Sequence, residues 1–141
     1  MDQQILYKYI KIETEQFATF EESFNDGVEE LHFQTEVMFG YAKEHGVLCN
    51  KIMVNISQMS TTILKVVVAS YFEIAKESIE MLSENNKVIF PPNFLVQIAS
   101  LNYGSIRGVI HAKTVNTKLN RIILPPFYFG NMIDKSFVAE L

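Results

Sequence analysis

Several features that would assign this sequence to a protein class are missing from it. A single cysteine, Cys49, excludes an internal disulfide framework and is typical of a protein from a reducing compartment. No run of about 18 apolar residues is present, which argues against a membrane-spanning helix. The first residues also lack the basic region and apolar stretch of a signal peptide. We therefore expect a cytoplasmic protein with no integral membrane segment.

Motifs that carry chemistry are equally scarce. The three histidines, His32, His45 and His111, have no metal-ligand spacing with Cys49 or with a pair of carboxylates. The sequence has no nucleophile elbow, no phosphate-binding glycine loop and no zinc-protease motif. The stretch from Asn93 to Lys113 contains no acid that could act as a general base. We therefore predict no catalytic residues, no metal and no cofactor.

The sequence does have enough apolar side chains for a folded domain. Its 141 residues are 48% hydrophobic and carry a net charge of −4, so we expect one domain over residues 1–141. Ten of the sixteen acids lie in residues 1–44, whereas residues 85–141 hold six bases and two acids. No basic stripe with interleaved aromatic residues is present, which argues against nucleic acid as a partner.

Four segments are predicted to be strands: Ile5 to Ile12, Glu30 to Lys43, Val47 to Gln58 and Thr62 to Ile74. The second alternates between apolar and polar residues, which predicts one buried face. The fourth is apolar on both faces, in the alternating sets Leu64, Val66, Val68 and Ile63, Val67, Ala69. We expect a helix to cover one side of it, and a second subunit or a bound chain to cover the other.

The segment between the first two strands, Glu13 to Gly27, is predicted to be a loop. It carries three phenylalanines among acids: Phe17, Phe20 and Phe24. Two interpretations stay open. The rings either attach the loop to the core, or form part of an apolar surface that a ligand or partner covers.

The stretch from Val88 to Thr114 predicts the main helix. Pro91 and Pro92 suit a first helical turn, and apolar residues then recur at helical spacing. Small residues recur four apart on one face, namely Ser100, Gly104, Gly108 and Ala112. Glycine inside a helix costs about 0.5–1 kcal/mol relative to alanine. We therefore expect a close backbone there, belonging either to this chain's own sheet or to a partner subunit.

The remaining segments complete an α+β fold. A short helix is predicted from Ala75 to Leu82, and the residues after Gly130 are predicted to form a second short helix or a loose tail. The expected architecture is a four-stranded antiparallel meander, packed on one face by a long C-terminal helix, with a short second helix.

The order of these elements resembles the SecB export chaperones. The matching pieces are Val66 to Ile74, Ile89 to Pro91, Ser100 to Gly108 and Ile122 to Pro126, and the resemblance covers roughly residues 4–129. It implies a cytosolic homotetramer, a dimer of dimers with the long helix at the subunit contacts and no catalytic site. It also implies that unfolded preproteins are held in apolar grooves without ATP and passed to the translocase motor SecA.

The resemblance further implies a crossover loop over Ala18 to Val28, and a groove along the last strand. The predicted peptide-binding residues are Phe17, Phe20, Phe24, Leu64, Val66, Val68 and Phe127. The predicted oligomer-interface residues are Ser100, Gly104, Gly108 and Ala112. The family's acid on the exposed face of the last strand falls on Lys65 here, and the tail from Gly130 lacks the family's contact to SecA.

Three other functions fit the same features. The chaperone could serve one dedicated client, such as an antitoxin. A hotdog-like acyl-binding or small-ligand-binding protein or enzyme would instead have a closed tunnel beside the helix, with His111 or Asn116 at its mouth. An interaction module would use the apolar strand only as an oligomer interface.

Overall fold

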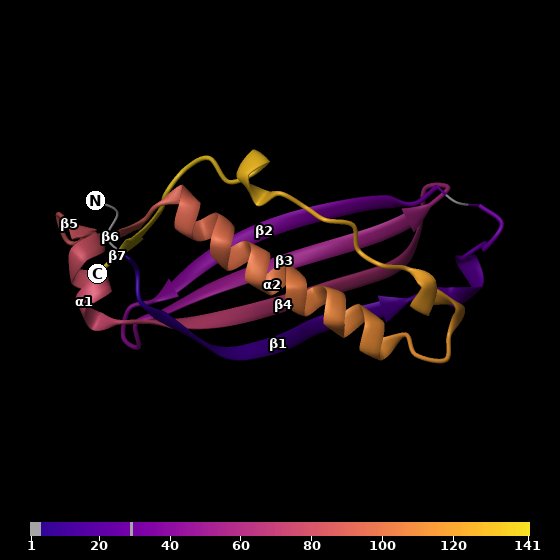
Figure 1. Cartoon of the computed structure of the whole chain (residues 1–141), viewed down its shortest axis with the longest axis horizontal. Helices are drawn as coiled ribbons and strands as arrows, with labels where there is room; N and C mark the ends of the chain where they lie inside the picture. The colour runs from indigo at the N-terminus through magenta and orange to yellow at the C-terminus, as the bar shows by residue number, and fades with distance from the viewer. Residues whose placement is uncertain (1–3, 29) are drawn as a thin grey trace.

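The computed structural model describes residues 4–28 and 30–141. Four long strands form one antiparallel sheet: β1 (Tyr7–Thr19), β2 (His32–Ala42), β3 (Val47–Gln58) and β4 (Thr61–Ile74). Their spatial order is β1-β4-β3-β2, so β2 to β4 form the predicted meander, and a crossover loop brings β2 to the far edge from β1. The long helix α2 (Pro92–Lys113) lies across one face of this sheet (Figure 1). The predicted α+β architecture is confirmed.

A smaller sheet lies at one end of the molecule. The short helix α1 (Lys76–Leu82) follows β4 and confirms the predicted short helix. The strands β5 (Ser83–Glu84), β6 (Lys87–Phe90) and β7 (Phe137–Glu140) then form a sheet in the order β5-β6-β7. Single 3-10 turns occur at η1 (Glu21–Ser23), η2 (Lys118–Arg121) and η3 (Phe129–Asn131).

The structure corrects the prediction for the end of the chain. After Gly130 it forms neither a second helix nor a loose tail. It completes η3 and then forms β7, which pairs with β6. Phe137 and Ala139 pack on a cluster of buried aromatic and aliphatic residues at this end. A four-residue strand whose partner lies far away in the sequence gives almost no local signal.

The inner side of α2 packs on β3 and β4, with Ile106 and Ile110 in the larger apolar cluster, which we call the main core, and Ile98 in a second cluster. Ile98, Ile106 and Ile110 of the helix are at most 1% exposed. Burying a large aliphatic side chain of this kind stabilises the fold by about 1.5–3 kcal/mol. The helix therefore docks through a continuous apolar stripe, as its periodicity predicted.

A polar contact fixes where α2 sits on the sheet. Asn102 is fully buried, and its Nδ2 donates to the main-chain oxygens of Asn50 and Val68, each at 3.1 Å. Its Oδ1 accepts a hydrogen bond from the Ser70 hydroxyl at 2.7 Å. The Tyr9 hydroxyl bonds to the same serine and to Ser105 of α2. Because unpaired buried polar groups cost about 1–3 kcal/mol each, these bonds favour one position of the helix.

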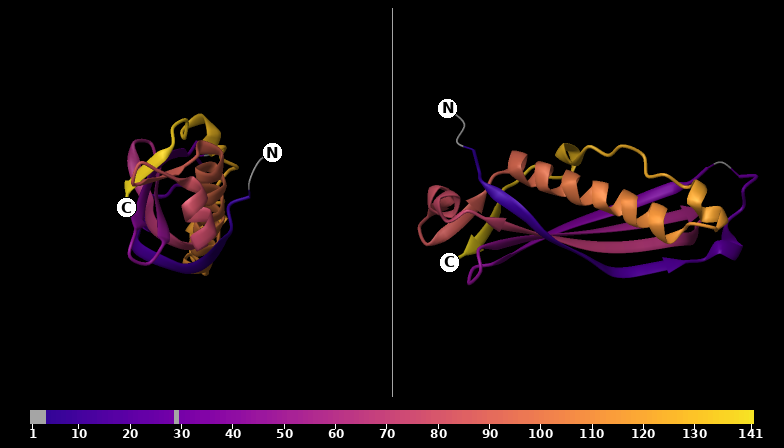
Figure 2. Two further views of the ribbon diagram at one scale, coloured as in Figure 1. Left: turned by 90° about the vertical axis from the view of Figure 1, so that its left-hand side faces the viewer. Right: turned by 60° about the horizontal axis from the view of Figure 1, so that its bottom comes forward.

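The chain after α2 returns along the β2 side of the helix toward the opposite end of the sheet (Figures 1 and 2). Ile122, Leu124 and Phe129 are 5%, 2% and 0% exposed and join the main core. The inner side chains of β2, including Phe33 and Val37, pack against the same core. This return segment (residues 122–133) thus covers part of the sheet that α2 leaves open.

The strand β1 is longer than predicted, because Glu13 to Thr19 continues it instead of forming a loop. The acids of this stretch pair with nearby lysines: Glu13 with Lys11 at 3.0 Å, and Glu15 with Lys51 at 2.7 Å. Two register irregularities, between Tyr9 and Lys11 and between Thr14 and Gln16, break the alternation. The period of two that marks a strand is therefore hidden in the sequence.

The outer face of β4 is less apolar than expected. Lys65, Val67 and Tyr71 are half-buried there, and the side chain of Ala69 is fully buried. The Lys11 ammonium lies 5.2 Å from the centre of the Tyr71 ring. Lys65, Val67 and Tyr71 keep part of their surface open in the single chain. The expectation that a second subunit or a bound chain covers this face therefore stays a prediction.

Candidate functional site

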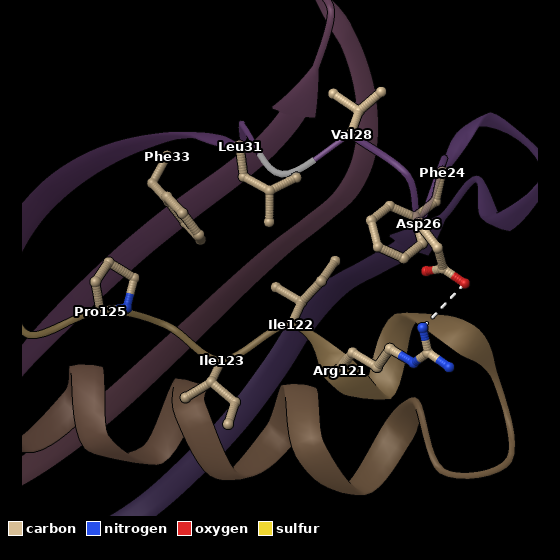
Figure 3. Close-up of a pocket in the computed structure, with 9 residues that line it drawn as sticks. All are labelled: Phe24, Asp26, Val28, Leu31, Phe33, Arg121, Ile122, Ile123 and Pro125. Atoms are coloured by element: carbon tan, nitrogen blue, oxygen red, sulfur yellow. Dashed lines mark ion pairs between the residues drawn. The ribbon is translucent and has the colours of Figure 1, made fainter.

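An open apolar hollow of about 540 Å³ lies between the start of β2 and the return segment. Figure 3 shows Leu31 and Phe33 projecting from one wall, and Ile122 from the facing wall. Phe24 and Val28 of the crossover loop, together with Ile123 and Pro125, complete the apolar lining. We call this space the first hollow.

Charge at the first hollow is confined to its rim. Arg121 Nη1 and Asp26 Oδ2 form an ion pair at 3.1 Å, and their side chains are 72% and 42% exposed. Such an exposed pair is worth at most about 1 kcal/mol. The interior therefore offers apolar contacts, with no buried charge to select a particular ligand.

A buried glutamine holds the crossover loop in place at the hollow. Gln58, at the end of β3, is 2% exposed. Its Nε2 donates to the carbonyl oxygens of Asn25 at 2.9 Å and Val28 at 2.8 Å, and its Oε1 accepts from the Asn25 N–H at 2.8 Å. Lys118 Nζ donates to the Phe24 carbonyl oxygen at 2.9 Å. These hydrogen bonds hold Phe24 and Val28 in position, although neither residue is part of a strand.

A second hollow, of about 250 Å³, lies further along β2. Val37 and Phe39 of β2 and Leu95 of α2 line it, together with residues of the chain end from Met132 to Phe137. Inner side chains of β2 line both hollows, because every second residue of a strand points to the same face. We call this row the β2 wall; it consists of Leu31, Phe33, Val37 and Phe39.

The β2 wall belongs to an edge strand. Within residues 4–28 and 30–141, β2 pairs only with β3. An edge strand presents unpaired N–H and C=O groups that can pair with another extended chain. Main-chain hydrogen bonding and apolar pockets are therefore available side by side.

The structure corrects the placement of three predicted peptide-binding residues. Leu64, Val66 and Val68 are fully buried in the main core. They occupy the inner row of β4, and α2 lies across that strand (Figure 1). They form the floor beneath the helix and not an open groove, so a peptide could contact them only after α2 moved.

The predicted phenylalanines do not gather at one surface. Phe24 is 8% exposed and lines the first hollow. Its ring therefore attaches the loop to the core, which was the first of the two interpretations. Phe17 lies half-buried on β1 with Lys113 Nζ 5.6 Å from its ring centre. Phe20 is 43% exposed and lines a polar hollow with Glu36 and Lys65.

Phe127 lies on the return segment and is 38% exposed. Its ring centre is 5.9 Å from that of Tyr103 on α2 and 4.7 Å from that of Phe129. It therefore forms part of an aromatic group beside α2, and it does not line the first or the second hollow.

The predicted interface residues all lie on the exposed side of α2: Ser100, Gly104, Gly108 and Ala112. Within the described part of the chain, a Cβ added to Gly104 or Gly108 would meet nothing within 4 Å. The chain's own sheet therefore does not pack against this small-residue stripe. Close packing of the stripe on this chain's own sheet is therefore excluded, and its packing on a partner subunit stays a prediction.

Features of catalysis do not converge on the hollows. Burial raises the pKa of the Cys49 thiol, on the outer side of β3, and so lowers its reactive thiolate fraction. Among the described residues, no three His, Cys, Asp or Glu side chains gather as metal ligands. The first hollow is an open groove, unlike the closed tunnel that the acyl-binding alternative requires.

Sequence reasoning missed the β2 wall and its partner, Ile122. The alternation from Glu30 to Lys43 did mark Leu31, Phe33, Val37 and Phe39 as one buried face, and Ile122 to Leu124 as an apolar run. No signal in either segment indicates that the two lie opposite each other.

Comparison with known proteins bears on the fold. No protein-family model matches the chain, and no curated protein matches its sequence. Among solved structures, it is similar to the SecB-like chaperone Rv1957 of Mycobacterium tuberculosis, in complex with a ChAD peptide from the Rv1956 HigA1 antitoxin. The TM-score is 0.56 at 10% identity, over 86% of this chain and 90% of that chain.

This chain has a SecB-like fold. Its antiparallel four-stranded sheet and long helix are the elements that the earlier resemblance implied. Among the helices described here, none has the length and apolar character needed to cross a membrane.

Proposed function

We propose that this protein is an ATP-independent chaperone, not an enzyme, that binds unfolded polypeptide in extended form along β2. The observation that carries the proposal is the first hollow, which is apolar, open and adjacent to a free strand edge. An extended chain can pair with such an edge while alternate side chains enter the pockets beside it. The apolar walls of the first hollow recognise the hydrophobic side chains of such a client.

We expect an affinity that is high enough to hold an unfolded client and low enough to release it. Each large apolar side chain that a client buries contributes about 1.5–3 kcal/mol. Part of this gain is lost in ordering the client chain. One hollow therefore binds weakly, and several in an assembly bind more strongly through multivalency.

We propose a dedicated client, such as an antitoxin, ahead of secretory preproteins. The peptide bound to Rv1957 comes from an antitoxin, which supports this choice. Lys65 stands on the outer sheet face where the resemblance implies an acid, whereas Lys11 and Lys51 on the same face are paired with Glu13 and Glu15. The lysine in place of that acid supports transfer to SecA less than it supports holding.

We also propose that the protein works in the cytoplasm as a homo-oligomer, a dimer of dimers. The small-residue stripe of α2 is exposed, and Leu101 on the same helix and Ile123 beside it are 39% and 70% exposed. The second sheet edge, β1, carries Ile10 and Ile12 at 45% and 52% exposure. A second copy that covers these surfaces would bury apolar area that the single chain leaves open.

Light scattering of a denatured model protein tests the chaperone function. We expect slower aggregation at equimolar concentration without ATP. Leu31→Glu, which introduces a charge at a half-buried position whose side chain projects toward Ile122 in the first hollow (Figure 3), should raise the concentration needed for protection at least tenfold.

The matched control is Met38→Glu, on the opposite face of β2 and 57% exposed, which should leave protection unchanged. If the wild-type protein protects no unfolded client, the proposed function is wrong. If Leu31→Glu protects as well as the wild type does, the function can stand but the first hollow is not its site.

A further inference from the structure

The last eight residues, Asp134 to Leu141, are bound to the rest of the protein as a short peptide would be. The strand β7 lies antiparallel to β6, with Phe137 opposite Phe90 and Glu140 opposite Lys87. The Leu141 N–H donates to the Asn86 carbonyl oxygen at 3.1 Å. The three residues before β7, from Asp134 to Ser136, are exposed and lie outside any helix or strand. The strand therefore follows a short exposed linker.

One aromatic ring anchors this strand. Phe137 stacks on Phe90 with 6.2 Å between ring centres and 16° between planes, and its centre lies 6.1 Å from that of Phe39 on β2. Ala139 and Leu141 pack on the same cluster, whereas Val138 is 48% exposed. The sequence of β7 thus shows which side chains this surface accepts: a large aromatic residue, then a small and an aliphatic residue at alternate positions.

The forces that hold β7 are few. Its pairing covers four residues, and its ion pair, Lys87 Nζ to Glu140 Oε1, spans 3.8 Å between side chains that are 48% and 74% exposed. An exposed pair of this kind contributes little. Short elements at a sheet edge open locally at a lower free energy than the core. We therefore expect β7 to detach without unfolding of the four-stranded sheet.

The surface beneath β7 continues into the proposed client groove. Phe137 lines the second hollow together with Val37 and Phe39, and these two belong to the β2 wall. Removal of β7 would enlarge that hollow and uncover Phe90, which is fully buried in its presence. The apolar track along β2 would then extend onto the free edge of β6.

We propose that β7 is an intramolecular occupant of a second polypeptide-binding surface, and that an extended client segment of the pattern aromatic-x-small-x-aliphatic displaces it. The inference rests on the proposed chaperone function and names a second surface and a sequence class for it. The client strand pairs with β6 and places its aromatic side chain against Phe90 and Phe39. Without a client, β7 keeps this aromatic surface closed to unwanted contacts.

A reversible crosslink in the full-length chain tests the displacement. Because Leu141 bonds to Asn86 and hydrogen-bonded pairs alternate along an antiparallel ladder, Ile89 and Val138 form a non-hydrogen-bonded pair. Side chains approach closely at such pairs, which suits a disulfide. The variant carries Ile89→Cys and Val138→Cys with Cys49→Ser, and thiol titration verifies the bond. If the two thiols stay free under oxidation, the strand register that the proposal needs is wrong.

The probe is a fluorescent peptide with the sequence of residues 134–141, DKSFVAEL, and its control carries Ala in place of Phe. By fluorescence anisotropy, we expect the reduced variant to bind the probe at least tenfold more tightly than the oxidised one, and the control peptide weakly. Equal affinity before and after oxidation would overturn the proposal.

Two single variants give a second readout. Phe137→Ala removes the anchor of β7 and should increase probe affinity about threefold to tenfold. Val138→Ala, a change on the exposed side of the same strand, should not. If Phe137→Ala left the affinity for the probe unchanged, the proposed displacement of β7 would be contradicted, even if the crosslinked variant failed to fold.

Light scattering separates this inference from the proposed function. If the oxidised variant still protects a denatured protein but binds the probe as well as the reduced one, only the second surface is wrong. If the wild type gives no protection, the chaperone function is wrong, whatever the probe does.

Discussion

The two sides of α2 differ in residue type and in environment. On the inner side, Ile98, Ile106 and Ile110 are almost fully buried, and Asn102 bonds to β3 and β4. On the outer side the stripe from Ser100 to Ala112 is exposed, and nothing in the described chain fills the space above its glycines. The inner side accounts for the fold of one chain. The outer side contributes no packing to that fold, which is why we propose assembly there.

The largest expected effect is on the inner side. Ile106→Ala removes a fully buried side chain. The change leaves a cavity between the helix and the sheet that the surrounding residues cannot fill completely. We expect the free energy of unfolding to fall by about 2–5 kcal/mol. Urea denaturation followed by circular dichroism measures it. A loss below about 1 kcal/mol would mean that α2 is not docked as described.

The polar contact of the inner side should come next. Asn102→Ala leaves the Ser70 hydroxyl and the Asn50 side chain without their helix partner. The expected loss is about 1–3 kcal/mol in the same denaturation experiment. Ser100→Ala, two residues away on the exposed side, is the control and should change stability by less than about 0.5 kcal/mol. Similar losses in both variants would remove the contrast between the two sides.

A large side chain on the outer side tests assembly directly. A Cβ at position 108 would meet nothing within 4 Å in the described chain and the position is exposed, so we expect Gly108→Phe to keep the fold. If copies associate through the small-residue stripe, self-association should weaken at least tenfold, as measured by sedimentation or light scattering. A wild-type protein that is monomeric at all accessible concentrations would contradict the proposed interface.

The smallest effect should be a gain in stability. Gly104→Ala fills open space and lowers the conformational freedom of the unfolded chain. We expect the free energy of unfolding to rise by about 0.5–1 kcal/mol, measured at a concentration where copies do not associate. A loss at that concentration would indicate that a segment of the same chain does pack on this side.

Local patterns predicted most of the fold. The strands β2 to β4 followed from period-two alternation, and α2 from its prolines and helical spacing, because these signals lie within each segment. The first strand was cut short, since its irregularities between Tyr9 and Lys11 and between Thr14 and Gln16 hide the alternation. The strand β7 was missed, because its partner β6 lies about fifty residues earlier in the chain.

The candidate site was predicted only in part. Phe24 was named and lines the first hollow, whereas Leu64, Val66 and Val68 were named and lie in the core. The difference depends on which part of the sheet α2 crosses. The helix lies over β3 and β4, and the return segment faces β2. No residue of β4 carries that information by itself.

The sequence by itself determined the class of fold, the presence of the long helix after the two prolines and the small-residue stripe on it. The signal for each repeats over a few residues within one segment. Only the tertiary structure decided that the small-residue stripe faces away from the sheet, which apolar row stays open and that the chain end closes a second surface. These features depend on contacts between segments far apart in the sequence. The free energy of such contacts comes from shared burial, which no single segment encodes alone.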